Sequence, residues 1–193
     1  MTLFRPVAAA LLLTSCRYHF DTPVARVHHG PAVRDHLDPL AAMPVTCPAC
    51  SPAHLDAMTN ATRMGLELAG HEVVDTDVIN AESRRRTSLS HDSHDESEGT
   101  TVVGQVFTEL PPAAQKELLT SMGVHGVMRA DLFLGPPLGA HLDREVTVTI
   151  TVHRLDDDAI AWTSRCTTMS IGMYPEPAIQ AAVQCALEGK TLW

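Results

Sequence analysis

A strict alternation of apolar and polar residues over positions 146–152 constrains the fold more than any other feature of the sequence. The apolar members are Val146, Val148, Ile150 and Val152, and threonines stand between them. Because successive side chains of a β-strand point to opposite faces, this pattern predicts a strand with one buried and one solvent-facing side. Three aspartates at 156–158 turn the chain, and residues 159–171 supply a partner strand. The sequence therefore predicts an antiparallel hairpin in the carboxyl-terminal part of the chain.

Helical and extended patterns alternate before this hairpin. A short strand is expected at 43–46, followed by a helix that begins at Ser51 and Pro52 and ends at Gly70. The other expected elements are a strand at 71–75, helices at 78–86 and 111–123, a buried strand at 124–134 and a last helix at 175–187. The order β-α-β-α-α-β-β-β-α predicts an α+β, α/β-like fold, with helices packed on a mixed sheet of about five strands.

The length and composition fit one domain with a tail. The chain has 193 residues, of which 45% are hydrophobic and 19% charged, as expected of a globular protein with a core. Residues 16–42 contain several prolines and no sustained period, so they are predicted to form a tether with an extended piece at 24–27. Residues 43–193 are predicted to form a single domain. Its segment near 87–100 is acidic and is predicted to be a mobile loop.

The net charge argues against nucleic acid as a partner. The chain carries a formal charge of -9, whereas proteins that bind phosphate backbones present basic surfaces. The only basic run comprises the three arginines at 84–86, and we interpret it as a solvated helix face.

The first 16 residues resemble the export signal of a bacterial lipoprotein. Arg5 precedes an apolar stretch at 6–13, which is too short for a membrane span because a spanning helix needs about 20 apolar residues. Residues 13–16 read Leu-Thr-Ser-Cys and resemble a lipobox. This resemblance implies removal of residues 1–15, a diacylglycerol on the sulfur of Cys16 and an acyl group on its new amino group. Several acyl chains give lasting attachment to a bilayer.

The residue after Cys16 bears on the predicted address. Arg17, rather than aspartate, occupies the second position of the mature chain. By similarity to the sorting rules of enteric lipoproteins, this implies the outer membrane, with the domain facing the periplasm.

Four cysteines remain besides Cys16, an even number typical of disulfides in an oxidising compartment. Cys166 lies roughly 17–20 Å before the end of its strand at about 3.3 Å per residue. Cys185 lies roughly 15 Å into the returning helix at about 1.5 Å per residue. Because the two thiols reach similar heights on neighbouring elements, we predict a disulfide between them that contributes about 3 kcal/mol to stability.

Cys47 and Cys50 form a Cys-Pro-Ala-Cys sequence between an expected strand and an expected helix. This placement resembles the thioredoxin redox motif, in which the helix amino end lowers the pKa of a thiol. The rest of the chain does not match the thioredoxin fold, and one Cys-x-x-Cys is a weak signal. Two interpretations remain open: a structural disulfide, either local or to another part of the domain, which we favour, and a redox-active pair. Zinc would require all four thiols to converge.

Histidines and carboxylates cluster between His91 and Glu98. His91 and His94 are weak candidates for metal ligands, and a solvated acidic loop is the favoured interpretation. The sequence contains no Gly-x-Ser-x-Gly elbow, no phosphate-binding loop and no helical His-x-x-x-His pair with a glutamate. We therefore predict no catalytic residues and no cofactor beyond the lipid on Cys16. Trp162 is predicted to lie in the core.

The order of these features is similar to two periplasmic α/β domains: that of the curli-secretion lipoprotein and the amino-terminal domain of the Tol-system propeller protein. The matching stretches are residues 70–75, 123–130 and the hairpin at 146–162. A closer resemblance is to a group of small lipoproteins from bacteria with an outer membrane. Residues 80–86, 164–166 and 185–188 carry that resemblance, which covers residues 43–189. It implies architecture and location, but no reaction.

Together these features predict a non-enzymatic interaction or assembly module of the bacterial envelope, anchored through Cys16. Its expected partners are the lipid bilayer and an envelope protein. The alternative is a thiol–disulfide oxidoreductase that uses Cys47 and Cys50.

Overall fold

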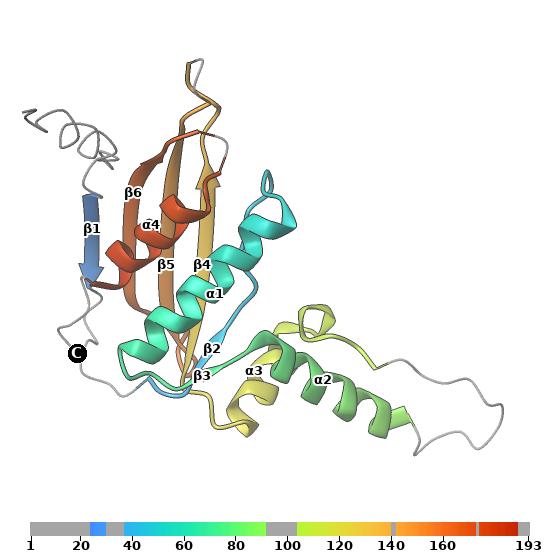
Figure 1. Cartoon of the computed structure of the whole chain (residues 1–193). Coiled ribbons are helices and arrows are strands. Elements are labelled where there is room, and N and C mark those ends of the chain that lie inside the picture. Colours follow the sequence, from blue (N-terminus) through green and yellow to red (C-terminus); the bar gives the residue numbers. More distant parts are fainter. Residues whose placement is uncertain (1–23, 30–36, 92–103, 140–141, 173, 189–193) are drawn as a thin grey trace, which may run out of the picture.

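The structure is a computed structural model that describes residues 24–29, 37–91, 104–139, 142–172 and 174–188 (Figure 1). Cys16, the predicted signal peptide and His94 lie outside the described residues, as do parts of the predicted tether and acidic loop.

Six strands form one mixed sheet in the order β1-β6-β5-β4-β2-β3. The strands are β1 (Val24–His29), β2 (Leu40–Ala42), β3 (Val73–Val74), β4 (Gly126–Leu134), β5 (Arg144–Arg154) and β6 (Ile160–Ser170). Neighbours from β1 to β4 are antiparallel, whereas β2 runs parallel to both β3 and β4. The α+β class and the carboxyl-terminal hairpin are confirmed. The strand beyond the five expected is β1, which pairs with β6.

Helices cover both faces of this sheet. They are α1 (Pro52–Leu68), α2 (Thr76–His91), α3 (Pro112–Ser121) and α4 (Glu176–Glu188), with a 3₁₀ turn, η1 (Phe107–Glu109). Figure 1 shows α1 and α4 side by side on one face. Leu40 packs in the core under these two helices, while its neighbour Ala41 packs with Ile79 of α2 and Leu119 of α3. Because adjacent strand residues point to opposite faces, α2 and α3 lie on the other face.

The central hairpin carries the main core. Val146, Val148, Ile150 and Val152 are all buried beneath α1 and α4, as the alternation predicted. On the other face, Thr147 and Thr151 hydrogen-bond across the hairpin to Thr167 and Thr163. The burial of Thr147 is thus accompanied by a partner for its hydroxyl, as a buried polar group requires.

Two elements differ from their expected limits. The strand expected at 43–46 is instead β2 at Leu40–Ala42; the chain bulges at Met43–Val45 and returns at Thr46 to bridge Asp131 of β4. The second helix continues to His91, past the expected end at residue 86. Thr87 and Ser88 fit this helix because their hydroxyls donate to carbonyls one turn earlier. The part of the acidic segment after His91 lies outside the described residues until Gly104.

The predicted tether contains more structure than expected. The extended piece expected at 24–27 is confirmed as β1. Strand β2 also lies within residues 16–42, and Leu37 is buried in the main core. Among the described helices, none combines the length and apolar character needed to cross a bilayer.

Candidate functional site at the Cys47–Cys50 turn

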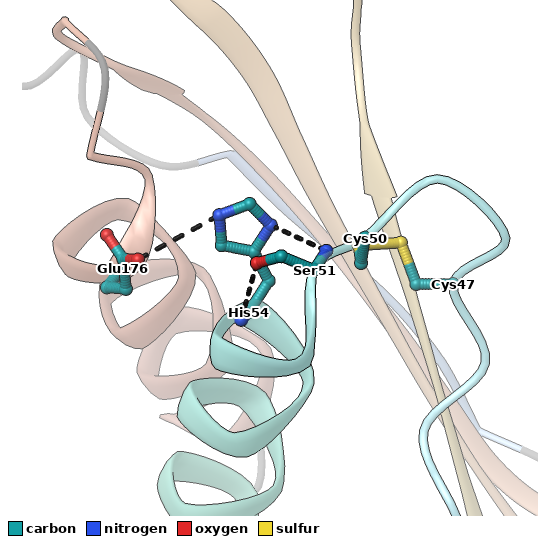
Figure 2. Close-up of a disulfide and its surroundings, with 5 residues drawn as sticks. All are labelled: Cys47, Cys50, Ser51, His54 and Glu176. Carbon is teal, nitrogen blue, oxygen red and sulfur yellow. Dashed lines mark hydrogen bonds and ion pairs between the residues drawn. A yellow bond between two sulfur atoms is a disulfide. The ribbon is translucent and has the colours of Figure 1, made fainter.

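Cys47 and Cys50 form a disulfide in the turn between Thr46, which bridges to β4, and the start of α1 (Figure 2). Their Cα atoms are 5.4 Å apart, and both side chains are half-buried against the main core. The segment before the disulfide is held on β4, because Thr46 donates its N–H to Ala130 and accepts from the N–H of Leu132. The disulfide therefore joins a fixed strand to the first turn of a helix.

The amino end of α1 is capped by residues that follow the disulfide. Ser51 is the N-cap, and its Oγ accepts the backbone N–H of His54 at 3.4 Å. The Nδ1 of His54 accepts the Ser51 N–H at 3.3 Å, which completes a capping box. The Nε2 of His54 lies 3.8 Å from Oε1 of Glu176, so this side chain also connects α1 with the start of α4 (Figure 2).

This geometry does not favour the oxidoreductase. Both cysteines precede the N-cap, so neither occupies the helix start where unpaired N–H groups would stabilise a thiolate. The N–H of His54, one of those groups, is taken by Ser51. The structure confirms the start of this helix at Ser51, so both cysteines lie just before its cap. This geometry favours a structural disulfide in the turn over a redox-active pair.

We expect reduced protein to show no turnover in an insulin-reduction assay above that of the Cys47→Ala variant. The reason is the position of both thiols outside α1. Protein with only Cys166 and Cys185 changed to alanine is the control, because it retains the motif. Catalytic turnover that Cys47→Ala abolishes would contradict the structural assignment.

Cys166 and Cys185 form the second disulfide, as predicted. It joins β6 to α4 with a Cα–Cα distance of 6.1 Å, and both side chains are buried in the main core. The strand and helix heights estimated from the sequence were therefore correct for this pair.

A cavity of about 490 Å³ lies next to the turn, between α1, the bulge at Met43–Val45 and the start of α2. Its polar lining includes Asn60, Arg63, Asp75 and Asp77. In the sheet, β2 lies between β3 and β4, and the helices that follow β2 and β3 lie on opposite faces. Open α/β sheets commonly bind ligands at such a point, where the chain changes from one face of the sheet to the other. Arg63 lies 4.0 Å from carboxylate oxygens of both Glu67 and Asp75, so its charge is already balanced. We assign no reaction to this cavity.

The weak metal candidates His91 and His94 are not tested, because His94 lies outside the described residues. Within the residues that the structure describes, no group of three or more histidine, cysteine, aspartate or glutamate side chains could hold a metal ion. His91 ends α2, and His94 falls in the gap before Gly104.

The arginine run at 84–86 is only partly a solvated face. Arg85 donates two hydrogen bonds to Glu82, at 2.7 and 2.6 Å, and Arg86 donates one at 2.8 Å. Hydrogen bonds from Arg85, and then from Arg86, lower the pKa of the Glu82 carboxyl from 4.5 to about 2. The i, i+3 and i, i+4 spacing of these residues is the sequence signal that could have predicted this cluster.

We expect an NMR titration of the Glu82 carboxyl carbon to give a midpoint near 2. A lowered carboxyl pKa stabilises the folded state above pH 4.5, and the contribution is lost as the pH falls from about 4.5 to 2. Arg85→Gln should move the midpoint back toward 4.5, whereas Arg84→Gln should not. An unchanged midpoint in Arg85→Gln would show that the hydrogen bonds do not form in solution.

Comparisons with known proteins define the fold but not a family. No family model matches the sequence, and no curated protein matches it. The resemblance to the curli-secretion and Tol domains therefore stays a prediction.

Solved structures do match. The PelC dodecamer from Paraburkholderia phytofirmans aligns with a TM-score of 0.54 and 14% identity, over 86% of this chain and 95% of PelC. A variant of the same dodecamer aligns with a TM-score of 0.54 and 12% identity, over 86% and 94%. Lipoprotein GNA1162 from Neisseria meningitidis aligns with a TM-score of 0.48 and 12% identity, over 78% of this chain and 95% of GNA1162. The chain thus shares the fold of PelC, at a sequence identity that establishes fold alone.

Proposed function

We propose that the chain is a lipid-anchored, non-enzymatic assembly module of the bacterial envelope, attached through Cys16 to the outer membrane and facing the periplasm. The main support for this proposal is how the five cysteines are used. Four of them form two disulfides within one folded unit, which leaves Cys16 as the odd thiol. That thiol stands at the end of a lipobox-like sequence, where a lipoprotein needs it. The disulfides also fit an oxidising compartment.

The proposal of assembly rests on two further observations. Cys47 pairs with Cys50 and Cys166 with Cys185 in disulfides, and the described residues form no group of metal ligands. These features give no support to a particular reaction. A protein of this fold, PelC, was solved as a dodecamer. A second copy of this chain is therefore the first partner to test, by light scattering of the purified protein in detergent.

We expect Cys16→Ser to move the protein from the membrane fraction to the soluble periplasmic fraction, in a bacterial host with an outer membrane. Without the thiol, no diacylglycerol can be attached, and the other acyl chain is then not added. Membrane fractionation and mass spectrometry of the mature amino terminus measure the result.

The matched control changes Cys47 and Cys50 to alanine, which removes two cysteines but leaves the lipobox intact. It should remain in the membrane fraction. Wild-type protein with an uncleaved, unmodified amino terminus would refute the anchor.

A further inference from the structure

Exposed apolar side chains gather at one end of the sheet. The β4–β5 connection and the β6–α4 connection meet there, because Leu134 pairs with Val146 and Arg144 pairs with Ser170. We call this end the apolar tip. Its members and their exposed fractions are Phe133 (54%), Leu138 (51%), Leu142 (38%), Ile171 (45%) and Tyr174 (74%). Five of the nine exposed large hydrophobic side chains of the described residues thus lie at this end.

The tip is held together by Asp143. The carboxylate of Asp143 accepts the backbone N–H of Gly172 at 3.0 Å, and its carbonyl accepts the N–H of Leu138 at 2.6 Å. One residue therefore ties the two connections to each other. These hydrogen bonds hold Leu138 and Gly172 against Asp143. A concentrated exposed apolar surface typically marks an interaction site.

The predicted anchor approaches the domain from this same end. β6 runs toward the tip, and β1 is antiparallel to it, with Val24 opposite Thr167 and His29 opposite Trp162. β1 therefore begins on the tip side and runs away from it, as its arrow in Figure 1 shows. Thr167 is three residues before the end of β6, a distance of about 10 Å.

The segment between Cys16 and β1 limits how far the tip can lie from the bilayer. Cys16 precedes Val24 by eight residues. Eight residues span at most about 26–29 Å when fully extended. Because the lipid enters the bilayer at Cys16, the end of the domain nearest Val24 is the end that reaches the membrane surface.

We propose that the apolar tip rests on the lipid bilayer that holds the anchor and inserts its side chains among the headgroups. This inference depends on the proposed attachment through Cys16. Tyr174 suits such a position, because its ring is apolar and its hydroxyl can stay in the hydrated headgroup layer. Contact at the tip adds to the attachment by the acyl chains and fixes which end of the domain points away from the membrane. The end that points away carries the hairpin turn at 156–158.

A depth measurement on the lipidated full-length chain tests this orientation. Purified protein is reconstituted into phosphatidylcholine vesicles, which keep lipid charge from contributing. A fluorophore is attached through Tyr174→Cys in one sample and through Asp157→Cys, on the far turn, in the other. With a spin-label quencher on the lipid headgroups, we expect quenching at position 174 to be at least about twofold stronger than at 157, since interfacial side chains sit roughly 5–10 Å deep.

The result separates the two proposals. Protein that does not float with the vesicles refutes the anchor itself. Protein that floats but shows equal quenching at the two positions keeps the anchor and overturns the tip contact. A fluorophore at position 174 that is already shielded from an aqueous quencher in the unlipidated chain, without vesicles or detergent, assigns the tip to a second copy of the chain and overturns the lipid contact.

A second measurement uses the Cys16→Ser chain produced without residues 1–15, which lacks both the acyl chains and the apolar stretch at 6–13. Its weak partitioning onto the same vesicles should fall about tenfold when Phe133 and Tyr174 are both changed to serine, because the apolar area available for insertion is lost. The matched control changes two exposed apolar residues at the other end, Leu68 and Ile160, and should leave partitioning unchanged. Equal losses in both double variants would refute a specific tip.

Discussion

Trp162→Ala is expected to lower the free energy of unfolding by about 3–5 kcal/mol and the Tm by roughly 10 °C. Trp162 is fully buried and is the largest such side chain among the described residues. It stands on β6 opposite Val152 and packs in the core under α1 and α4. Its removal leaves a cavity that rigid neighbours on a central strand can fill only in part. Denaturant unfolding followed by circular dichroism measures the change.

Ile160→Ala is the matched control for this variant. Ile160 lies two residues earlier on the same strand but is 48% exposed, so its loss should cost no more than about 0.5 kcal/mol. A cost below about 1 kcal/mol for Trp162→Ala would contradict the burial described here.

Changing both Cys166 and Cys185 to alanine is expected to lower the free energy of unfolding by about 3 kcal/mol. The disulfide closes a loop with a sequence separation of 19, and in the chain-entropy view it stabilises the fold by restricting the unfolded chain. Alanine is the right replacement because both sulfurs are buried, and serine would add a buried hydroxyl. Thermal and denaturant unfolding of wild type and variant, both without reductant, give the difference.

The other disulfide supplies the control. Cys47 and Cys50 have a sequence separation of only 3, so their replacement by alanine should cost about 1.5 kcal/mol on the same model. If this pair instead costs more than Cys166 and Cys185, the turn contributes through native contacts at α1 rather than through loop entropy.

Local signals in the sequence were sufficient for much of the fold. The alternation at 146–152 predicted β5 and its buried face, and Ser51 with Pro52 marked the start of α1. The Cys166–Cys185 disulfide could be predicted from strand and helix lengths, whereas the partner of Cys47 was left open between a local and a cross-domain disulfide. These features depend on period, capping and distance along the chain, which are properties of the sequence itself.

Other features depended on partners far away in the sequence. The sequence predicts an extended piece at 24–27 but not its partner. Residues 24–29 form β1 because the free edge of β6 supplies hydrogen-bond partners. The hairpin also contains an irregularity between Val152 and His153, opposite Ala161. As a result Ala161 and Trp162 are both buried, although strict alternation would expose one of them.

The sequence by itself predicted the class of the fold, the Cys166–Cys185 pair and the candidate lipid site, because each follows from composition, element lengths or short-range spacing. Only the tertiary structure decided that residues 24–29 join the sheet as an edge strand beside β6. It also decided that β1 begins beside the exposed apolar end of the sheet. Both outcomes depend on how distant strands pair in register and direction, which no local pattern specifies.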